Sequence, residues 1–488
     1  MEASAKKQVY NPYLPSYEYI PDGEPHIWND RVYIYGSHDC YGSDNYCAND
    51  YVCWSAPVDD PSDWRYEGII YKKSQHPYPV SRELMFAPDV AKGKDGRFYL
   101  YYSMAHSSVT SVAVCDEPAG KYEYLGDIKN SSGETIGNRA GDLYQFDPAV
   151  LVDDDGKIYL YSGFCPARDV DEGGMLYKGA HVCELEEDMV TIKSMPHVII
   201  PKEDRREIHE GYFEAPSIRK IDGLYYLVYS ARCTGLYYYY SQYPDKEFKF
   251  GGRIHSTSDV GINGHTEDAP AYPVGNTHGG IVKLRGQYYI FNHRLTNNSS
   301  YARQGVAEPI TIDNGIIRQA EATSCGLNGE PLRGEGEYPA YIACNLFKMH
   351  SAENALSHDE AGKAPVPRIT QAEPDWEPSV EDYDSGPRQY IAAIQDRCVV
   401  GYKYFLIEKD IDCVDLRVRG KAQGTIELAV EEKEGCIGRQ DVDINSDEWT
   451  NTSIRVNCPK GKQALYVRYE GSGYWDMDSF VLNVRLKE

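Results

Sequence analysis

The sequence predicts an all-β protein, with a five-bladed β-propeller over residues 1–322 and a β-sandwich of the jelly-roll type over residues 390–488. Two observations predict this class: a hairpin motif recurs five times at similar spacing, and seven short alternating strands follow near the C-terminus. The composition agrees, because 43 glycines, 27 prolines and 43 tyrosines are typical of a chain rich in turns and strands. No segment of helical periodicity stands out.

Each copy of the motif joins an apolar strand to an aromatic-rich strand through a tight turn. The clearest copy is VLVDDDGKIYLYSG from Val150, with Asp155-Gly156 at the turn. The central tyrosines of the five copies lie about 60 to 67 residues apart: Tyr33, Tyr99, Tyr159, Tyr226 and Tyr289. Each repeat has room for two outer strands besides its hairpin, and four-stranded sheets repeating at this scale are propeller blades.

The chain changes character after the fifth hairpin. Residues 323–389 predict a connector packed on the surface, and the part from Ser351 to Gln389 is rich in Pro, Glu, Asp and Ala. Strand patterns resume at Tyr390 with QYIAAI, VVGYKYF, DCVDLRVRG, GTIELAVEE, TSIRVNCP, QALYVRYEG and SFVLNVRL. Seven short alternating strands in one stretch favour a β-sandwich.

Charge and targeting signals exclude some classes of protein. A net charge of −25 argues against a nucleic-acid partner, since phosphate binding needs a basic face. No apolar window is long enough for a membrane span, and the N-terminal residues lack the apolar core of a secretory signal. The 13 cysteines are scattered without CxxC pairs, so we expect reduced thiols and a cytoplasmic protein.

One ionisable residue stands about eleven positions before each central tyrosine: Asp22, Asp89, Asp147, Glu214 and His278. The innermost strands of a propeller run along its axis, so equivalent positions converge at one end of the central channel. Several carboxylates in one funnel repel each other and raise the pKa of the most buried. One protonated and one ionised carboxyl is the combination that glycosidic cleavage requires.

The segments around these residues resemble glycoside hydrolase family 43 over roughly residues 10 to 345. They include YIPDGEPHIWND, FAPDVAKGKDG, QFDPAVLVDDDG, GYFEAPSIRKIDG and NTHGGIVKL, in order. The resemblance implies a five-bladed propeller that hydrolyses α-L-arabinofuranosides or β-D-xylosides with inversion. It implies that Asp22 is the general base, that Asp147 orients the acid and modulates its pKa, and that Glu214 is the general acid.

Several assignments stay open at this stage. The Asp22-Gly23-Glu24-Pro25-His26 stretch departs from the common family form, so Glu24 is the alternative as base or substrate contact. Asp89 either positions blade two or contacts substrate. His278 is a core histidine, a substrate contact or, by the resemblance, a ligand for a channel cation. Arg294 is a candidate to bind a sugar hydroxyl or to keep Asp22 ionised.

Aromatic residues near the ring are candidates for the walls of a sugar site, because sugar faces rich in C–H groups stack on rings. We select Trp28, Phe86 and Phe146. The C-terminal stretch GSGYWDMDSF resembles family 6 carbohydrate-binding modules. Asp476 and Asp478 there could ligate a structural calcium or be surface turn residues, and the module could bind glycan or brace the propeller.

These observations predict an inverting exo-glycosidase that needs no cofactor for catalysis and removes terminal α-L-arabinofuranosyl or β-D-xylosyl units from plant-derived oligosaccharides. One alternative is a non-catalytic glycan-binding propeller. Another is a member of the same family with a different specificity, such as a galactosidase or an endo-arabinanase. The sequence predicts no oligomeric state.

Overall fold

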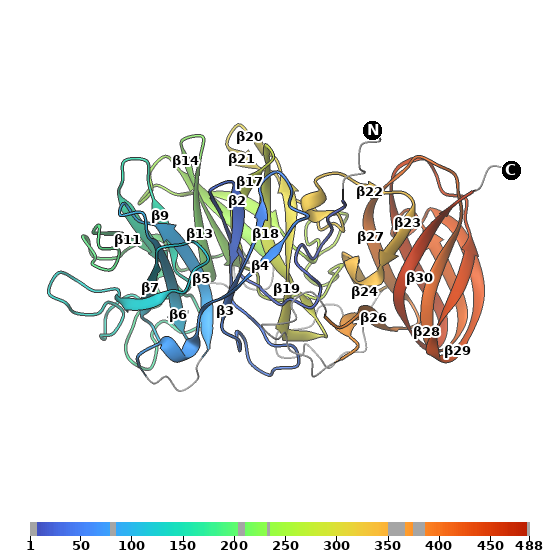
Figure 1. The fold of residues 1–488 in the computed structure, drawn as a ribbon, viewed down its shortest axis with the longest axis horizontal. Coiled ribbons are helices and arrows are strands. Elements are labelled where there is room, and N and C mark those ends of the chain that lie inside the picture. Colours follow the sequence, from blue (N-terminus) through green and yellow to red (C-terminus); the bar gives the residue numbers. More distant parts are fainter. Residues whose placement is uncertain are drawn as a thin grey trace.

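The computed structural model describes residues 7–78, 84–203, 210–231, 235–349, 367–373 and 386–485. A ring of small sheets forms one part of the molecule, and a larger C-terminal sheet lies beside it, toward the right in Figure 1. In the part of the chain that the structure describes, no helix has the length and apolarity to cross a membrane. The all-β prediction is confirmed.

Five consecutive antiparallel sheets make the ring, each paired in chain order or its reverse. Blade one contains β1 (Glu24–Trp28), β2 (Arg31–Tyr35), β3 (Tyr51–Pro57) and β4 (Arg65–Tyr71). Blade two contains β5 (Met85–Lys92), β6 (Phe98–Met104), β7 (Thr110–Cys115) and β8 (Glu123–Asp127), after the short 3-10 helix η1 (Lys73–Gln75). Blade three contains β9 (Ala149–Val152), β10 (Ile158–Ser162), β11 (Gly179–Leu185) and β12 (His197–Pro201).

Blade four contains β13 (Glu214–Ile221), β14 (Leu224–Ala231), β15 (Gly235–Ser241) and β16 (Lys249–His255). Blade five has three strands, β17 (Ile281–Leu284), β18 (Gln287–Thr296) and β19 (Ser299–Ile310), and the small hairpin β20 (Ile312–Asp313) and β21 (Ile316–Ile317) follows it. A parallel bridge between Gly23 and Gly279 joins the entries of blades one and five. The ring is therefore closed next to Asp22.

The hairpin turns and the tyrosines behave as predicted. Asp222-Gly223 and Arg285-Gly286 both have positive φ at each position, the geometry of the tight hairpin turn. The five central tyrosines are all buried, and each belongs to a different one of the five apolar clusters between neighbouring blades. The repeat thus builds the blade-to-blade contacts, which hold the inner strands around the axis.

The C-terminal sheet is formed by nine strands. They are β22 (Leu332–Arg333), β23 (Gly336–Pro339), β24 (Asn345–Lys348), β25 (Arg368–Gln371), β26 (Gln389–Ile394), β27 (Cys398–Ile407), β28 (Ile411–Ala429), β29 (Cys436–Arg455) and β30 (Gly461–Val484), with the 3-10 helices η2 (Gly326–Asn328) and η3 (Ala340–Ile342) nearby. The first four strands come from the predicted connector 323–389, most of whose acidic, Pro-rich part lies outside the described residues.

Two pairs of the predicted short strands are continuous in the structure. DCVDLRVRG and GTIELA both belong to β28, and QALYVRYEG and SFVLNV both belong to β30. Gly420 lies inside β28 with a φ of +134°, and its missing side chain leaves room for the backbone of Trp475. These glycines therefore bend long strands and do not end them.

Candidate active site

Four of the five predicted ring residues meet in one cavity at the end of the propeller axis. Asp22, Asp147, Glu214 and His278 all line a cavity of about 220 Å³. They come from the entries of blades one, three, four and five, so the repeat brings together residues that are far apart in the chain. Its polar side also includes Arg303 of β19, Tyr46 of the loop after β2, Ser230, Asn276 and Thr277.

The backbone at this cavity adopts a conformation that is uncommon for residues with a side chain. Asp22 has a φ of +59°, Asp147 of +49°, and Ala215, directly after Glu214, of +65°. Such left-handed residues cluster where a structure holds a side chain in a required direction. Here the kink at the entry of the inner strand in blades one, three and four turns a carboxyl group toward the cavity.

Asp22 lies between a guanidinium and a neutral imidazole. Arg303 Nη1 is 3.2 Å and 3.4 Å from the two carboxylate oxygens of Asp22. The backbone N–H of Asp22 donates to His293 Nδ1, and His293 Nε2–H donates to the Asn276 carbonyl, so one neutral tautomer is fixed. Burial lowers the pKa of His293 to about 3. Burial opposes ionisation of Asp22, but the charge of Arg303 leads the groups that outweigh it, and the pKa of Asp22 is lowered.

Asp147 and Glu214 form a second carboxyl pair in the cavity. Asp147 is buried and accepts a hydrogen bond from the backbone N–H of Ala215. Burial and then the negative charge of Glu214 raise the pKa of Asp147 well above its ordinary value. Because the two groups interact, the retained proton belongs to the pair. The cavity thus favours the ionised form of Asp22 and favours retention of a proton by the Asp147–Glu214 pair.

Asp89 does not reach the cavity, because it lies deeper on its strand. In blade four Glu214 pairs with Ser230, four residues after the central tyrosine, and in blade two Phe86 occupies the same level, opposite Ser103. Asp89 pairs with Tyr101, only two residues after the tyrosine, and Glu24 pairs with Tyr35 at the matching level of blade one. Asp89 precedes its tyrosine by 10 residues, against 11 or 12 for Asp22, Asp147 and Glu214, and this shorter offset corresponds to the deeper level of the channel.

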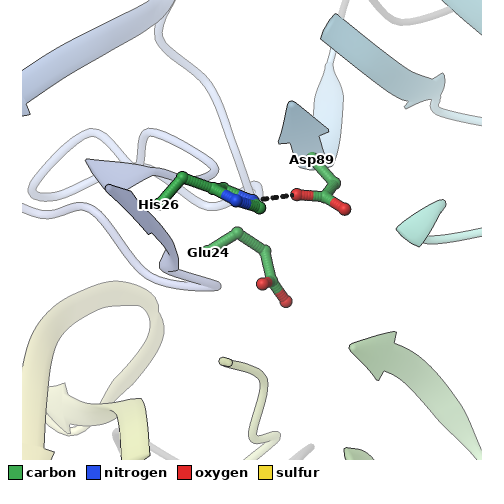
Figure 2. Close-up of side chains that lie close together, drawn as sticks. All are labelled: Glu24, His26 and Asp89. Atoms are coloured by element: carbon green, nitrogen blue, oxygen red, sulfur yellow. Dashed lines mark hydrogen bonds and ion pairs between the residues drawn. The ribbon is translucent and has the colours of Figure 1, made fainter. Parts of the chain in front are cut away.

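Glu24, His26 and Asp89 form a buried polar group at this deeper level (Figure 2). His26 Nε2 is 2.6 Å from Asp89 Oδ1, and Arg219 Nη2 is 2.6 Å from Glu24 Oε2. The backbone N–H groups of Val90 and Val150 donate to Asp89. Asp89 therefore joins blades two and three, which is the blade-positioning role. Glu24 does not line the cavity, so the geometry favours Asp22 as the candidate base.

His278 lies between the two levels. Its Nδ1 is 3.9 Å from Asp147 Oδ2 and its Nε2 is 3.7 Å from Glu24 Oε1. Both distances are too long for direct hydrogen bonds. The imidazole lines the cavity and separates the Asp147–Glu214 pair from the Glu24 group below it.

Arg294 and Trp28 lie away from the cavity, contrary to the prediction. Arg294 Nη1 donates to the Ala343 carbonyl and Nη2 to the Tyr341 carbonyl, so this side chain joins the propeller to the C-terminal part. It is the neighbour of His293 on β18, and successive side chains of a strand point to opposite faces. Trp28 packs against His26 and Phe98 between blades one and two. The arginine of the site is Arg303, which sequence reasoning missed.

The two candidate calcium ligands are paired with arginines. Asp476 accepts from Arg419 Nε at 3.0 Å and from the backbone N–H of Ala393. Asp478 is buried and makes ion pairs with Arg388 and Arg417. Cationic side chains occupy the places where a calcium ion would need further oxygen ligands. These contacts disfavour a calcium site. They also show that Asp476 and Asp478 are not simple surface turn residues, since both are paired with arginines.

Aromatic rings form the apolar wall of the cavity. Phe86 and Phe146 line it as predicted, and their ring centroids are 5.6 Å apart. The row continues with Phe164, 5.1 Å from Phe146, and Phe213, 5.2 Å from Phe164. Phe213 directly precedes Glu214, and Phe164 follows the inner hairpin of blade three, so adjacency to the ring motifs was a usable signal for both.

Comparison with known proteins agrees with this geometry. The model of glycosyl hydrolases family 43 matches residues 20–317, which include all five blades and the candidate catalytic residues. The chain belongs to glycosyl hydrolases family 43. A relative named xylosidase/arabinosidase, from Thermoclostridium stercorarium, is 46% identical over 488 residues, covering 98% of this chain and 99% of the relative.

Solved structures of family 43 proteins resemble this fold. An enzyme from Xanthomonas citri complexed with xylose is 25% identical, with a TM-score of 0.51, covering 64% of this chain and 93% of that chain. An arabinoxylan arabinofuranohydrolase from Bacillus subtilis, in complex with cellotetraose, is 19% identical with a TM-score of 0.50 and shares the fold over 97% of both chains. The family 43 chain described here is therefore a glycoside hydrolase with a C-terminal β-sheet domain.

Proposed function

We propose that this glycoside hydrolase removes single α-L-arabinofuranosyl or β-D-xylosyl units from the non-reducing ends of plant-derived oligosaccharides, with inversion at the anomeric carbon. The observation that carries the proposal is the single cavity shared by Asp22, the Asp147–Glu214 pair and the row of phenylalanines. The printed name of the 46% identical relative, xylosidase/arabinosidase, supports the choice of sugars. The xylose bound to the Xanthomonas citri enzyme supports it as well.

The proposed reaction uses the opposed protonation states of the cavity. Asp22, ionised beside Arg303, takes a proton from a water that attacks the anomeric carbon. Glu214 gives the proton of the carboxyl pair to the departing glycosidic oxygen. The Asp147 and Glu214 carboxyl groups are then both ionised until the pair takes up a new proton. The phenyl rings contact the C–H face of the sugar and exclude water from that face.

The size of the cavity supports exo action. Its volume of about 220 Å³ lies below the range of about 300–1,000 Å³ that is usual for pockets holding drug-sized ligands. One terminal sugar ring suits such a space better than an internal stretch of a polymer chain. This argues against the endo-arabinanase alternative. The retained carboxyl groups and their opposed environments argue against a propeller that only binds glycan.

A substrate panel tests the proposal. Wild type, Asp22→Asn, Glu214→Gln and Glu24→Gln are assayed on 4-nitrophenyl α-L-arabinofuranoside, β-D-xyloside and β-D-galactoside. We expect loss of about 10³-fold or more in kcat for the first two variants and a smaller loss for Glu24→Gln. Proton NMR of the first-formed sugar should show the anomer opposite to that of the substrate. A retained anomer, or full activity of Asp22→Asn, would contradict the mechanism.

We propose that catalysis itself needs no cofactor, and that the Glu24 level of the channel does not fit a dedicated divalent cation. Glu24 Oε1 is buried without a hydrogen-bond partner, but its other oxygen already has the Arg219 guanidinium as counter-ion. A cation bound at Glu24 would be repelled by the Arg219 guanidinium. Thermal unfolding and activity after EDTA treatment, with and without added CaCl₂, should be unchanged.

We propose a bracing role for the C-terminal domain, whose identity with family 6 carbohydrate-binding modules stays a prediction. Lys403 of β27 is 1% exposed and places its Nζ 2.6 Å from Asp259 and 3.0 Å from Glu321. These contacts, with those of Arg294, join the domain to blades four and five. Retardation by soluble xylan in affinity gels would favour glycan binding instead. The cytoplasmic location also stays a prediction, which cell fractionation can test.

A further inference from the structure

We propose that Asp39 is the positioning residue of the catalytic base: it fixes the guanidinium of Arg303 so that only Nη1 faces Asp22. This inference rests on the proposed role of Asp22 as base. Asp39 lies in the loop after β2 and is 1% exposed. It does not line the cavity, so its effect on the reaction passes through Arg303.

The contacts show an unequal sharing of one guanidinium between two carboxylates. Arg303 Nε is 2.8 Å from Asp39 Oδ2 and Nη2 is 2.9 Å from Asp39 Oδ1. This is a bidentate ion pair with the distances typical of charge-assisted hydrogen bonds. The contacts of Arg303 Nη1 with Asp22 are longer, at 3.2 Å and 3.4 Å. Asp39 therefore holds the guanidinium, while Asp22 receives its charge without a tight bond.

Asp39 is itself fixed from several directions. The backbone N–H of Cys47 donates to Oδ1 at 3.0 Å, and the backbone N–H of Arg303 donates to Oδ2 at 3.1 Å. The Asp39 N–H donates to the Tyr19 carbonyl, and the side chain of Asn49 donates to the Asp39 carbonyl. The ring of Tyr46 covers the guanidinium, with 4.9 Å from its carbon to the ring centroid. Arg303 thus has one remaining direction, toward Asp22.

This arrangement has a chemical consequence for the base. A carboxylate tied by a short two-pronged pair would lose both oxygens and much of its basicity to the arginine. Because Asp39 makes the bidentate pair, Asp22 stays ionised with only the longer contacts to Arg303 Nη1, and its oxygens retain lone pairs for the proton of water. The other charged or titratable groups that face Asp22 are His293, His278, Asp147, Cys47 and Tyr51.

A double-mutant cycle tests the inference, because two residues that act as one unit show strongly non-additive effects. Wild type, Asp39→Asn, Arg303→Met and the double variant are compared on the preferred 4-nitrophenyl glycoside. We expect Asp39→Asn to lower kcat about tenfold, with KM changed less than about threefold, since a positioned transition-state interaction is lost. The double variant should be no slower than Arg303→Met alone. Multiplied losses, or wild-type kcat in Asp39→Asn, would overturn the proposal.

Two controls separate this inference from stability and from the proposed function. Asp153→Asn removes a buried carboxylate that bonds Lys220 and Tyr225 between blades three and four, and it should leave kcat unchanged at comparable thermal stability. If Asp39→Asn does not fold, Asp39→Glu keeps the charge but displaces the fork, and kcat should still fall about tenfold; unchanged kcat there would refute the role. If wild type hydrolyses no glycoside, or Asp22→Asn is fully active, the proposed function itself fails.

Discussion

Replacing Arg303 by methionine should make the base harder to ionise. At 3.2 Å and an effective dielectric constant near 20, the attraction between Arg303 and Asp22 has a ceiling of about 5 kcal/mol. Aspartates beside arginines have pKa values lowered by about 1–3 units, or about 1.4–4 kcal/mol. The acidic limb of kcat/KM, where the base gains its proton, should therefore move up by about 1–3 pH units in Arg303→Met.

The assay is the pH dependence of kcat/KM on the preferred 4-nitrophenyl glycoside. Arg294→Met is a matched control, because Arg294 is equally buried on the neighbouring strand but donates to the carbonyls of Ala343 and Tyr341. It should lower stability and leave the acidic limb in place. An unmoved limb in folded Arg303→Met would refute the electrostatic role of Arg303, and a moved limb in Arg294→Met would refute its assignment to the domain interface.

Three further predictions concern the parts around the site. Lys403→Met leaves Asp259 and Glu321 without their cation and should lower the apparent free energy of unfolding by about 3–5 kcal/mol. Lys409→Met, whose partner Glu335 is exposed, should cost less than about 1 kcal/mol. Denaturant titration measures both losses, and equal losses would contradict the bracing role of Lys403. Burial lowers the pKa of His181 to about 4, so between about pH 6.5 and about pH 4 the unfolded chain binds a proton that the folded chain does not. In that window this histidine should lower the free energy of unfolding by about 1.4 kcal/mol for each pH unit of acidification, and His181→Gln should remove that contribution. An unchanged slope of the free energy of unfolding against pH in His181→Gln would contradict this. Phe164→Ala should raise KM about tenfold by loss of about 1.5 kcal/mol of apolar contact, and wild-type KM would exclude the ring from the sugar site.

The local features of the propeller were predictable because they depend on short stretches of chain. Turn pairs such as Asp222-Gly223 specify hairpins, and the tyrosine at the centre of each hairpin is buried between blades in all five repeats. The C-terminal strands were harder to delimit. β28 and β30 are continuous across glycines such as Gly420, and only the pairing with the partner strand shows this continuity.

The site residues divide along the same line. Asp22, Asp147 and Glu214 could be placed because each stands at the entry of an inner strand. In the structure Asp22, Asp147 and Ala215 have positive φ at these entries. Asp89 stands 10 residues before its tyrosine, against 11 or 12 for the other ring residues, and an average spacing of about eleven hid this difference, which the register of β5 against β6 shows as a deeper level. Arg294 is suggested by its place at the end of the fifth motif, but strand alternation turns it toward the C-terminal domain, and Arg303 of the next strand reaches the cavity.

The sequence by itself determined the number of blades, the all-β class, the three candidate carboxyl groups and two of the four phenylalanines of the wall. These depend on repeated local patterns whose spacing is set by hairpins and strand lengths. Only the tertiary structure decided that Arg303 serves Asp22, that Asp39 holds Arg303, and that Glu24, His26 and Asp89 form a separate level. Those pairings join residues up to 281 positions apart, and their distances follow from blade packing, which no local pattern encodes.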